Sequence, residues 1–230
     1  MILCIETATG VCSAALCNDN GIFMLREAAE GKSHAAQLTV LISELLESAA
    51  VNAGSLDAVA VSKGPGSYTG LRIGVSVAKG IAYAAGIPLI GINTLTAMYY
   101  GYTAKNQIPD GEKILLCPMI DARRMEVYNA LFTPGGDMIR VTSADIIDEN
   151  SFKDQLDQGK VIFFGNGSAK CMEMIRHNNA FFYPDFSLSA SYLYLPSMIA
   201  LREKIFEDVA YFEPFYLKEF IATIPRKPFL

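Results

Sequence analysis

Histidine is scarce in this 230-residue sequence, and the cysteines do not form a recognisable ligand set. The two histidines, His34 and His177, stand alone, and neither has a partner at the spacing that metal sites use. The five cysteines are an odd number, and none belongs to a Cys-x-x-Cys pair. A zinc site is therefore not expected. Cys4, Cys12 and Cys17 lie in apolar, strand-like runs, which predicts that they are small core residues.

Positive charge is also in short supply. The chain has 19 Lys and Arg against 24 Asp and Glu, which gives a net charge of −5. A mildly acidic chain lacks the excess of positive charge that a protein needs to bind nucleic acid without a partner. If RNA is a ligand, we expect a partner protein to supply most of the positive charge.

Two segments lack what a targeting or membrane signal needs. The apolar N-terminus has no basic region in front of it, and Glu6 interrupts the run, so a signal peptide is not expected. Residues 80–104 carry no charge, but Gly86-Ile87-Pro88 breaks this stretch in the middle. A buried helix, a buried strand and a second helix explain it better than a membrane span. We therefore expect no membrane contact and a cytoplasmic location.

The glycine-rich stretch SKGPGSYTGLRIG, residues 62–74, lacks both common phosphate fingerprints. Gly64, Gly66 and Gly70 are spaced two and four apart, whereas the dinucleotide motif needs two and three. A P-loop would need Gly-Lys-Ser/Thr at its end, and here Gly70 is followed by Leu71 and Arg72. The stretch still has the form of a strand, a turn and a helix.

The predicted elements follow the order β-β-β-α-β-α-β-α in the first half of the chain, and the second half repeats the first six of them. In the first half, strands are expected at residues 2–7, 11–17, 22–26, 56–61 and 88–92, with helices from 38 to 49, at 69–85 and after 94. In the second half, strands are expected at 114–120, 125–132, 138–141 and 161–164, with helices at 151–158 and 169–177.

This repeated order predicts an α/β fold made of two ribonuclease-H-like halves. We expect a first domain over residues 1–104 and a second over 112–230. The linker is expected at about 105–111, where the sequence KNQIPDG is the most linker-like stretch.

A stripe of small residues lies four apart along the helix that follows the glycine turn: Gly70, Gly74, Ala78 and Ala82. Such a stripe permits close approach of another element. Glycine inside a helix costs about 1 kcal/mol relative to alanine, so a packing reason is required. Two readings stay open: the stripe faces the protein's own sheet, or it faces a partner's helix.

The stretch SKGPGSYTGLR, with Gly74 and Ala78 behind it, resembles the signature of the TsaB/YeaZ family. Weaker matches follow in the expected order: ILCIETAT at residues 2–9, SHAAQL at 33–38, IDARRMEVY at 120–128 and EPFYL at 213–217. The resemblance covers the chain from its first residue to about residue 217.

The resemblance implies the actin, sugar-kinase and heat-shock-ATPase superfold, which also consists of two ribonuclease-H-like halves. It implies a non-catalytic scaffold or activator subunit, needed to transfer threonylcarbamoyl to N6 of the adenosine next to the anticodon of tRNA. The chain would act through a heterodimer with its catalytic paralogue TsaD, with the ATPase TsaE as a further partner. It would contact tRNA indirectly, through the complex. Whether the lone chain forms a homodimer stays open.

The catalytic relative carries a His-x-x-x-His metal motif in its first long helix. At the corresponding place this chain has His34 and Leu38, so the ligand pair is lost. The resemblance thus implies no cofactor and no metal of its own, with ATP only at the level of the partner complex. The alternative is a self-sufficient ATP-dependent phosphotransferase of the same superfold. Glu6 and Asp121 stand where such kinases place their two acidic residues.

Two sets of side chains are the candidate binding residues. The partner interface is expected on the first two long helices, where two helices from each partner would form a four-helix contact; the candidates are His34, Leu38, Leu41, Ile42, Leu45, Gly70, Gly74, Ala78 and Ala82. The candidates for binding an anion are Lys63, Arg72, Arg123 and Arg124. For these four, a salt bridge within the chain or simple solvation is the alternative.

Overall fold

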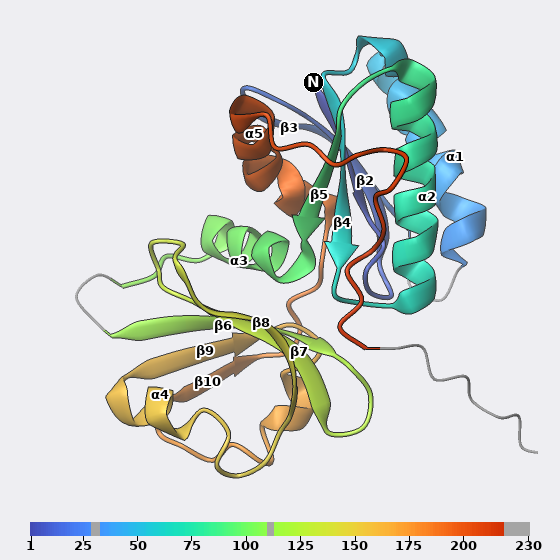
Figure 1. Ribbon diagram of the computed structural model, residues 1–230. Helices are drawn as coiled ribbons and strands as arrows, with labels where there is room; N and C mark the ends of the chain where they lie inside the picture. The colour runs from blue at the N-terminus through green and yellow to red at the C-terminus, as the bar shows by residue number, and fades with distance from the viewer. Residues whose placement is uncertain (29–32, 110–112, 219–230) are drawn as a thin grey trace, which may run out of the picture.

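The computed structural model of the protein describes residues 1–28, 33–109 and 113–218. They form two lobes, each built on a five-stranded mixed sheet (Figure 1). The first sheet consists of β1 (Ile2–Glu6), β2 (Cys12–Asn18), β3 (Gly21–Ala28), β4 (Ala58–Gly64) and β5 (Leu89–Asn93). The second consists of β6 (Ile114–Asp121), β7 (Glu126–Phe132), β8 (Met138–Ile146), β9 (Lys160–Phe164) and β10 (Ala180–Tyr183).

The two sheets share one topology. The strand orders are β3-β2-β1-β4-β5 and β8-β7-β6-β9-β10. In each sheet the first three strands are antiparallel neighbours, and the last two add in parallel. The helices are α1 (His34–Ala49), α2 (Tyr68–Ala85), α3 (Thr94–Lys105), α4 (Lys153–Gln158) and α5 (Tyr194–Glu203), with short 3-10 turns η1 (Ala53–Ser55), η2 (Ala169–Cys171) and η3 (Ala190–Leu193). The expected duplicated ribonuclease-H-like fold is confirmed.

The second half departs from the predicted elements at one place. The helix predicted over residues 169–177 is wrong, because only the single turn η2 forms there. The strand β10, which the sequence analysis did not predict, follows shortly after it. Asn179 O accepts a hydrogen bond from Val161 N at 2.9 Å, and Ala180 pairs with Val161. The chain must return to this sheet edge, which leaves no room for a long helix.

The charge-free stretch at residues 80–104 forms the end of α2, then β5, then α3, as predicted. Gly86 ends α2 in the left-handed conformation with φ 67°, and the Asn93 side chain caps α3 by accepting from Leu95 N and Thr96 N. None of the helices in the described part of the chain is long and apolar enough to cross a membrane.

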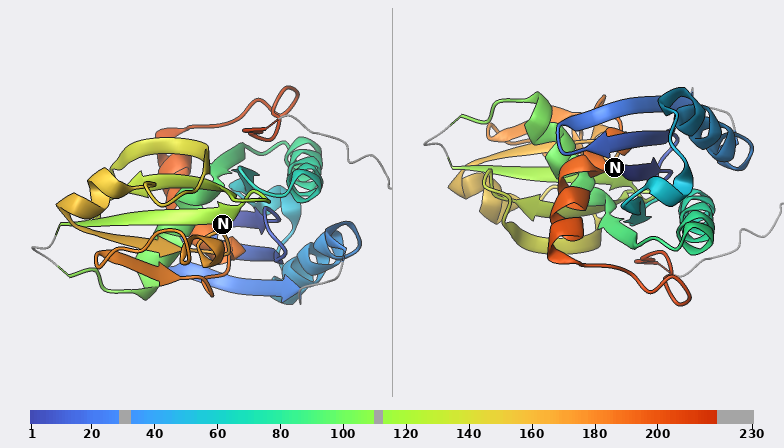
Figure 2. Two further views of the ribbon diagram at one scale, coloured as in Figure 1. Left: turned by 90° about the horizontal axis from the view of Figure 1, so that it is seen from below. Right: turned by 90° about the horizontal axis from the view of Figure 1, so that it is seen from above.

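Strand β1 is buried on both faces, as central strands in parallel pairs usually are. Leu3 and Ile5 pack with the buried faces of α1 and α2. Ile2 and Cys4 point the other way, into a cluster that also contains residues of α3, α5 and the second sheet. Figure 2 shows the resulting layers, with α1 and α2 on one side of the first sheet and α5 on the other.

Each lobe contributes helical elements that pack against the sheet of the other lobe. α3, from the first half, contacts β6 and β7 of the second sheet, while η3 and α5, from the second half, contact strands of the first sheet. One core cluster therefore serves both lobes. The division into domains at residues 105–111 stays a prediction; residues 110 and 111 lie outside the described residues.

The small-residue stripe of α2 faces the protein's own sheet. Gly70, Gly74, Ala78 and Ala82 are all buried. A Cβ atom on Gly70 would overlap the backbone oxygen of Thr7, and one on Gly74 would overlap the Thr7 hydroxyl. Of the two readings of the stripe, packing on the chain's own sheet is the correct one. The expectation that these four residues meet a partner helix is wrong, because no other chain can reach them.

The contact between α2 and Thr7 predicts opposite effects for one substitution at two glycines of the same helix. We expect Gly70→Ala to lower the free energy of unfolding by about 1–3 kcal/mol, because the new methyl overlaps backbone that cannot move freely. Gly80→Ala is the matched control: nothing lies within 4 Å of its Cβ position, so it should raise stability by up to about 1 kcal/mol. Urea unfolding of both variants tests this. Equal effects would contradict the packing described.

Candidate functional site

Glu6 ends β1 at the place where kinases of this superfold carry an acidic residue. Its carboxylate is fully buried, accepts a hydrogen bond from Ala8 N at 2.6 Å and a second from the Ser62 hydroxyl. Burial raises the pKa of Glu6 from 4.5 to about 7, against the opposing effect of these hydrogen bonds. The side chain thus ties β1 to β4 and does not face an open site.

The turn between β1 and β2 uses its own backbone donors. A phosphate nest needs several backbone N–H groups that converge on open space. Here Ala8 N donates to Glu6, and Val11 N lies 3.5 Å from the Thr9 hydroxyl. In addition, Ser67 N of the glycine-rich turn before α2 donates to Ala8 O at 2.7 Å. The glycine-rich turn therefore closes over the β1–β2 turn.

The space beside this turn is small. A cavity of about 50 Å³ lies between the lobes, lined among others by Thr9, Gly10, Ile120 and Asn166. Pockets that hold small ligands usually measure about 300–1,000 Å³. In this conformation the cavity has room for water molecules but not for a nucleotide.

Asp121, the second acidic position, lies at the end of β6 and belongs to a different local structure. Its side chain is about half exposed (48%) and forms an ion pair with Lys170 at 2.5 Å. It also accepts a hydrogen bond from Arg123 N at 2.7 Å. Asp121 thus holds the turn that follows β6. Among the described residues, no three His, Cys, Asp or Glu side chains are grouped as a metal site would require.

The candidate interface residues of α1 do not all face outward. Leu38, Ile42 and Leu45 are buried against the first sheet, so for these three the interface prediction is wrong. Leu41 is half-buried beside them. His34 is half-buried, and its Nε2 lies 3.1 Å from Val11 O, which fixes the start of α1 to the β1–β2 turn.

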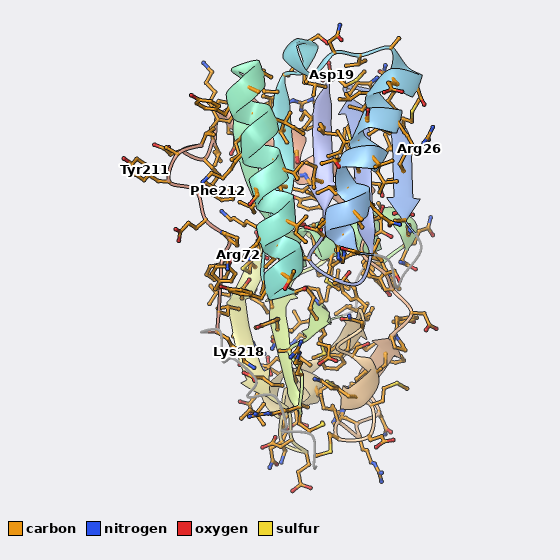
Figure 3. All side chains as sticks on the ribbon, turned by 90° about the vertical axis from the view of Figure 1, so that its right-hand side faces the viewer. Asp19, Arg26, Arg72, Tyr211, Phe212 and Lys218 are labelled. Carbon is orange, nitrogen blue, oxygen red and sulfur yellow. The ribbon has the colours of Figure 1, made fainter. Side chains whose placement is uncertain are left out.

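A second small-residue stripe, missed in the sequence, runs along the outer face of α2. Ser76, Gly80 and Ala84 lie four apart and are exposed. Half-buried apolar side chains flank them and complete an apolar outer surface; they are Leu41 of α1 and Ile73, Val77 and Ile81 of α2. Figure 3 views this face, where α1 and α2 lie side by side. We call these seven residues the α1–α2 outer face.

The four candidate anion-binding residues are divided between two roles. Lys63 forms an ion pair with Glu207 at 2.9 Å. Of the two interpretations given for this residue, the salt bridge within the chain is therefore the one that the structure supports. Arg72 is exposed, and its Nη1 donates to the Tyr68 hydroxyl at 2.9 Å. Arg123 and Arg124 are exposed in the turn after β6. The last three stay candidates.

The segment that follows α5, residues 205–218, contributes contacts that the sequence analysis did not predict. We call it the C-terminal strap. Lys79 Nζ on α2 donates to Phe212 O at 2.8 Å, and Phe215 N donates to Lys63 O at 2.6 Å. Figure 3 shows the strap along the edge of α2, with Phe212 turned inward and Tyr211 outward. The only signal for it was the weak EPFYL match at residues 213–217.

Comparison with known proteins gives a consistent result. The family model described as TsaD, tRNA N6-adenosine threonylcarbamoyltransferase, matches residues 27–224. The tRNA threonylcarbamoyladenosine biosynthesis protein TsaB of Escherichia coli K12 is 37% identical over 127 residues, which are 55% of this chain and 52% of that protein. The protein of the same name from Bacillus subtilis 168 is 29% identical over 181 residues, 76% of this chain and 74% of that protein. The chain thus spans about half the length of the Escherichia coli relative.

Two solved structures from Pseudomonas aeruginosa share the fold. One, described as an uncharacterized protein with similarity to peptidase YEAZ, has a TM-score of 0.80 and 22% identity, covering 94% of this chain and 99% of its own. The other, described as YeaZ, has a TM-score of 0.76 and 23% identity over the same shares of both chains. At this identity the likeness shows the fold alone.

The buried carboxyl of Glu6 predicts a pH-dependent difference in stability. Between pH 4.5 and about 7 the folded protein holds a proton on Glu6 that the unfolded chain releases, so rising pH removes stability through this window. Glu6→Gln cannot titrate. Relative to the natural protein, the variant should therefore gain on the order of 3 kcal/mol between about pH 5 and about pH 8.

Urea unfolding of both proteins at the two pH values tests this prediction. Taking the difference between the two proteins cancels the titration of all other groups. A difference that does not change with pH would show that Glu6 titrates normally.

Proposed function

Since this chain belongs to the TsaD family of tRNA N6-adenosine threonylcarbamoyltransferase proteins, as one of its TsaB/YeaZ members, we propose that it is a non-catalytic subunit in the synthesis of threonylcarbamoyladenosine in tRNA. It activates a catalytic paralogue of the TsaD type by forming a heterodimer with it. The complex works in the cytoplasm, and TsaE is a further component. Two relatives are named tRNA threonylcarbamoyladenosine biosynthesis protein TsaB, which supports a role of this chain in the same biosynthesis.

The observation that carries the non-catalytic role is the closed turn after β1. Glu6 is buried and bonded to its own chain, and α2 packs over Thr7 and Ala8 so closely that only glycine fits. The start of α1, where the resemblance places the metal motif of the catalytic relatives, also supports this role. Leu38 is buried in the core, and the His34 ring contacts a backbone carbonyl.

The α1–α2 outer face supports the heterodimer. It combines half-buried apolar side chains with exposed small residues, which lets another helix approach closely. A paralogue with the same fold brings matching helices, so that two helices from each partner form a four-helix contact. This keeps the location of the predicted interface but assigns it to different residues of α2.

Loss of the protein should lower the modified nucleoside in tRNA. We expect cells depleted of this chain to lose most threonylcarbamoyladenosine while total tRNA stays constant, because the subunit is needed for the transfer and not for tRNA synthesis. Mass spectrometry of digested tRNA measures the nucleoside, and re-expression of the chain is the control. An unchanged nucleoside level after depletion would refute the proposed function.

A bulky residue at the centre of the outer stripe should block the partner. We expect Gly80→Leu to weaken association with the TsaD-type partner roughly tenfold or more, because overpacking of a close contact typically costs about 1–3 kcal/mol. Folding should be preserved, since the position opens to solvent. Gly135→Leu, at an exposed turn of the second lobe, is the matched control. Calorimetric titration and thermal melting separate the two effects; full binding by a folded Gly80→Leu variant would place the interface elsewhere.

A further inference from the structure

Aromatic and cationic side chains meet where the start of α2, the C-terminal strap and the β6–β7 turn come together. The rings of Tyr68 and Tyr216 lie 4.9 Å apart at 34°, and the Arg72 guanidinium lies 5.2 Å from the centre of the Tyr68 ring. Arg123 and Arg124 lie in the turn between β6 and β7. We call Tyr68, Arg72, Arg123, Arg124 and Tyr216 the arginine–tyrosine surface.

The strap brings the two lobes together at this surface. Lys218, two residues after Tyr216, forms an ion pair with Glu126 and lies 3.3 Å from Ala122 O, on either side of the arginine turn. Burial, and after it the charge of Arg124, lowers the pKa of Lys218. Figure 3 shows Arg72 near the start of α2, with Lys218 beyond it on the same edge of the molecule.

Among the described residues, lysines and not arginines form the ion pairs with the carboxylates of this region. Lys218 pairs with Glu126, and Lys170 pairs with Asp121. Within residues 1–28, 33–109 and 113–218, none of the three arginines of the surface forms an ion pair. Glu213 is the exposed carboxylate that lies near Tyr216. Among the residues that the structure describes, three exposed guanidinium groups without an ion-pair partner thus lie at this place, although the whole chain has a net charge of −5.

The backbone of the arginine turn is held in an unfavourable conformation. Arg123 and Arg124 have φ of 66° and 50°, and the left-handed region costs a residue with a Cβ roughly 1–2 kcal/mol. Asp121 and Lys170 maintain the turn: Arg123 N donates to Asp121 Oδ1, and Lys170 Nζ donates to Arg124 O at 2.7 Å. Both arginine side chains are thereby exposed to solvent. Such strain is often retained where a ligand binds.

We propose that the arginine–tyrosine surface binds the tRNA substrate of the complex, an inference that rests on the proposed function. Arg72, Arg123 and Arg124 contact backbone phosphates, since guanidinium forks match phosphate oxygens. Tyr216, with 38% of its surface exposed, stacks on a base of a single-stranded loop. Aromatic rings beside spaced arginines favour single-stranded RNA, because each of its nucleotides offers both a phosphate for a guanidinium group and a base that stacks on a ring. The chain then touches tRNA directly, contrary to the expectation of purely indirect contact.

The test measures binding of a fluorescent, unmodified tRNA transcript to the complex of this chain with its TsaD-type partner. We expect the double variant Arg72→Glu/Arg124→Glu to bind roughly tenfold more weakly or worse, with the slope of log K against log salt reduced by about one per lost phosphate contact. Tyr216→Ala should weaken binding severalfold, and Tyr216→Phe should restore it. Arg176→Glu/Arg202→Glu, which changes the net charge equally at other exposed arginines, is the control and should bind normally.

The outcomes separate this inference from the proposed function. Partner association is measured in parallel with each variant. If the double variant binds tRNA as the control does, the inference is wrong, and the role in tRNA modification is untouched. If the double variant associates more weakly with the partner, but the complex that still forms binds tRNA with unchanged affinity, the surface is a protein interface. The inference is then also wrong. The proposed function itself fails only if depletion of the chain leaves the modified nucleoside unchanged.

Discussion

The close approach of α2 to the Thr7–Ala8 backbone is the constraint on which the other features of the first lobe depend. Only glycine fits at positions 66, 70 and 74, because a larger residue would overlap that backbone or the Thr7 side chain. This contact closes the β1–β2 turn, covers the buried Glu6 and fixes the rotation of α2 about its axis. With one face of the helix used against the sheet, the Ser76–Gly80–Ala84 stripe must face outward and Arg72 must lie at the exposed edge.

The sequence predicted the fold well and the orientation of α2 poorly, for a physical reason. The duplication follows from the order of strands and helices, since the second half repeats the order of the first. The helix, however, carries two stripes of small residues with the same spacing of four, one beginning at Gly70 and the other at Ser76. Periodicity cannot say which of them faces the sheet. The decision comes from a tertiary contact with a turn some 60 residues earlier, which no local pattern encodes.

The same limit applies to the charged residues. Lys63 was a reasonable candidate for binding an anion, but its partner Glu207 lies 144 residues further along the chain. Arg72, Tyr216 and Arg124 come together only because the strap returns along α2 and ends beside the β6–β7 turn. Ion pairs and surfaces that join distant segments depend on the path of the chain. The arginines themselves were visible in the sequence, and their grouping was not.

The exchange of covering elements between the lobes affects how the protein is made. Ser13 on β2 accepts a hydrogen bond from Ala190 N at 2.8 Å, and the residues of η3 and α5 share a core with Ala15 and Cys17 of the same strand. During synthesis on the ribosome, the first sheet emerges long before the residues that cover this face of it. Contacts so distant in sequence slow folding and leave apolar surface open in the meantime. We therefore expect this face of the nascent first lobe to stay uncovered until η3 and α5 have left the ribosome.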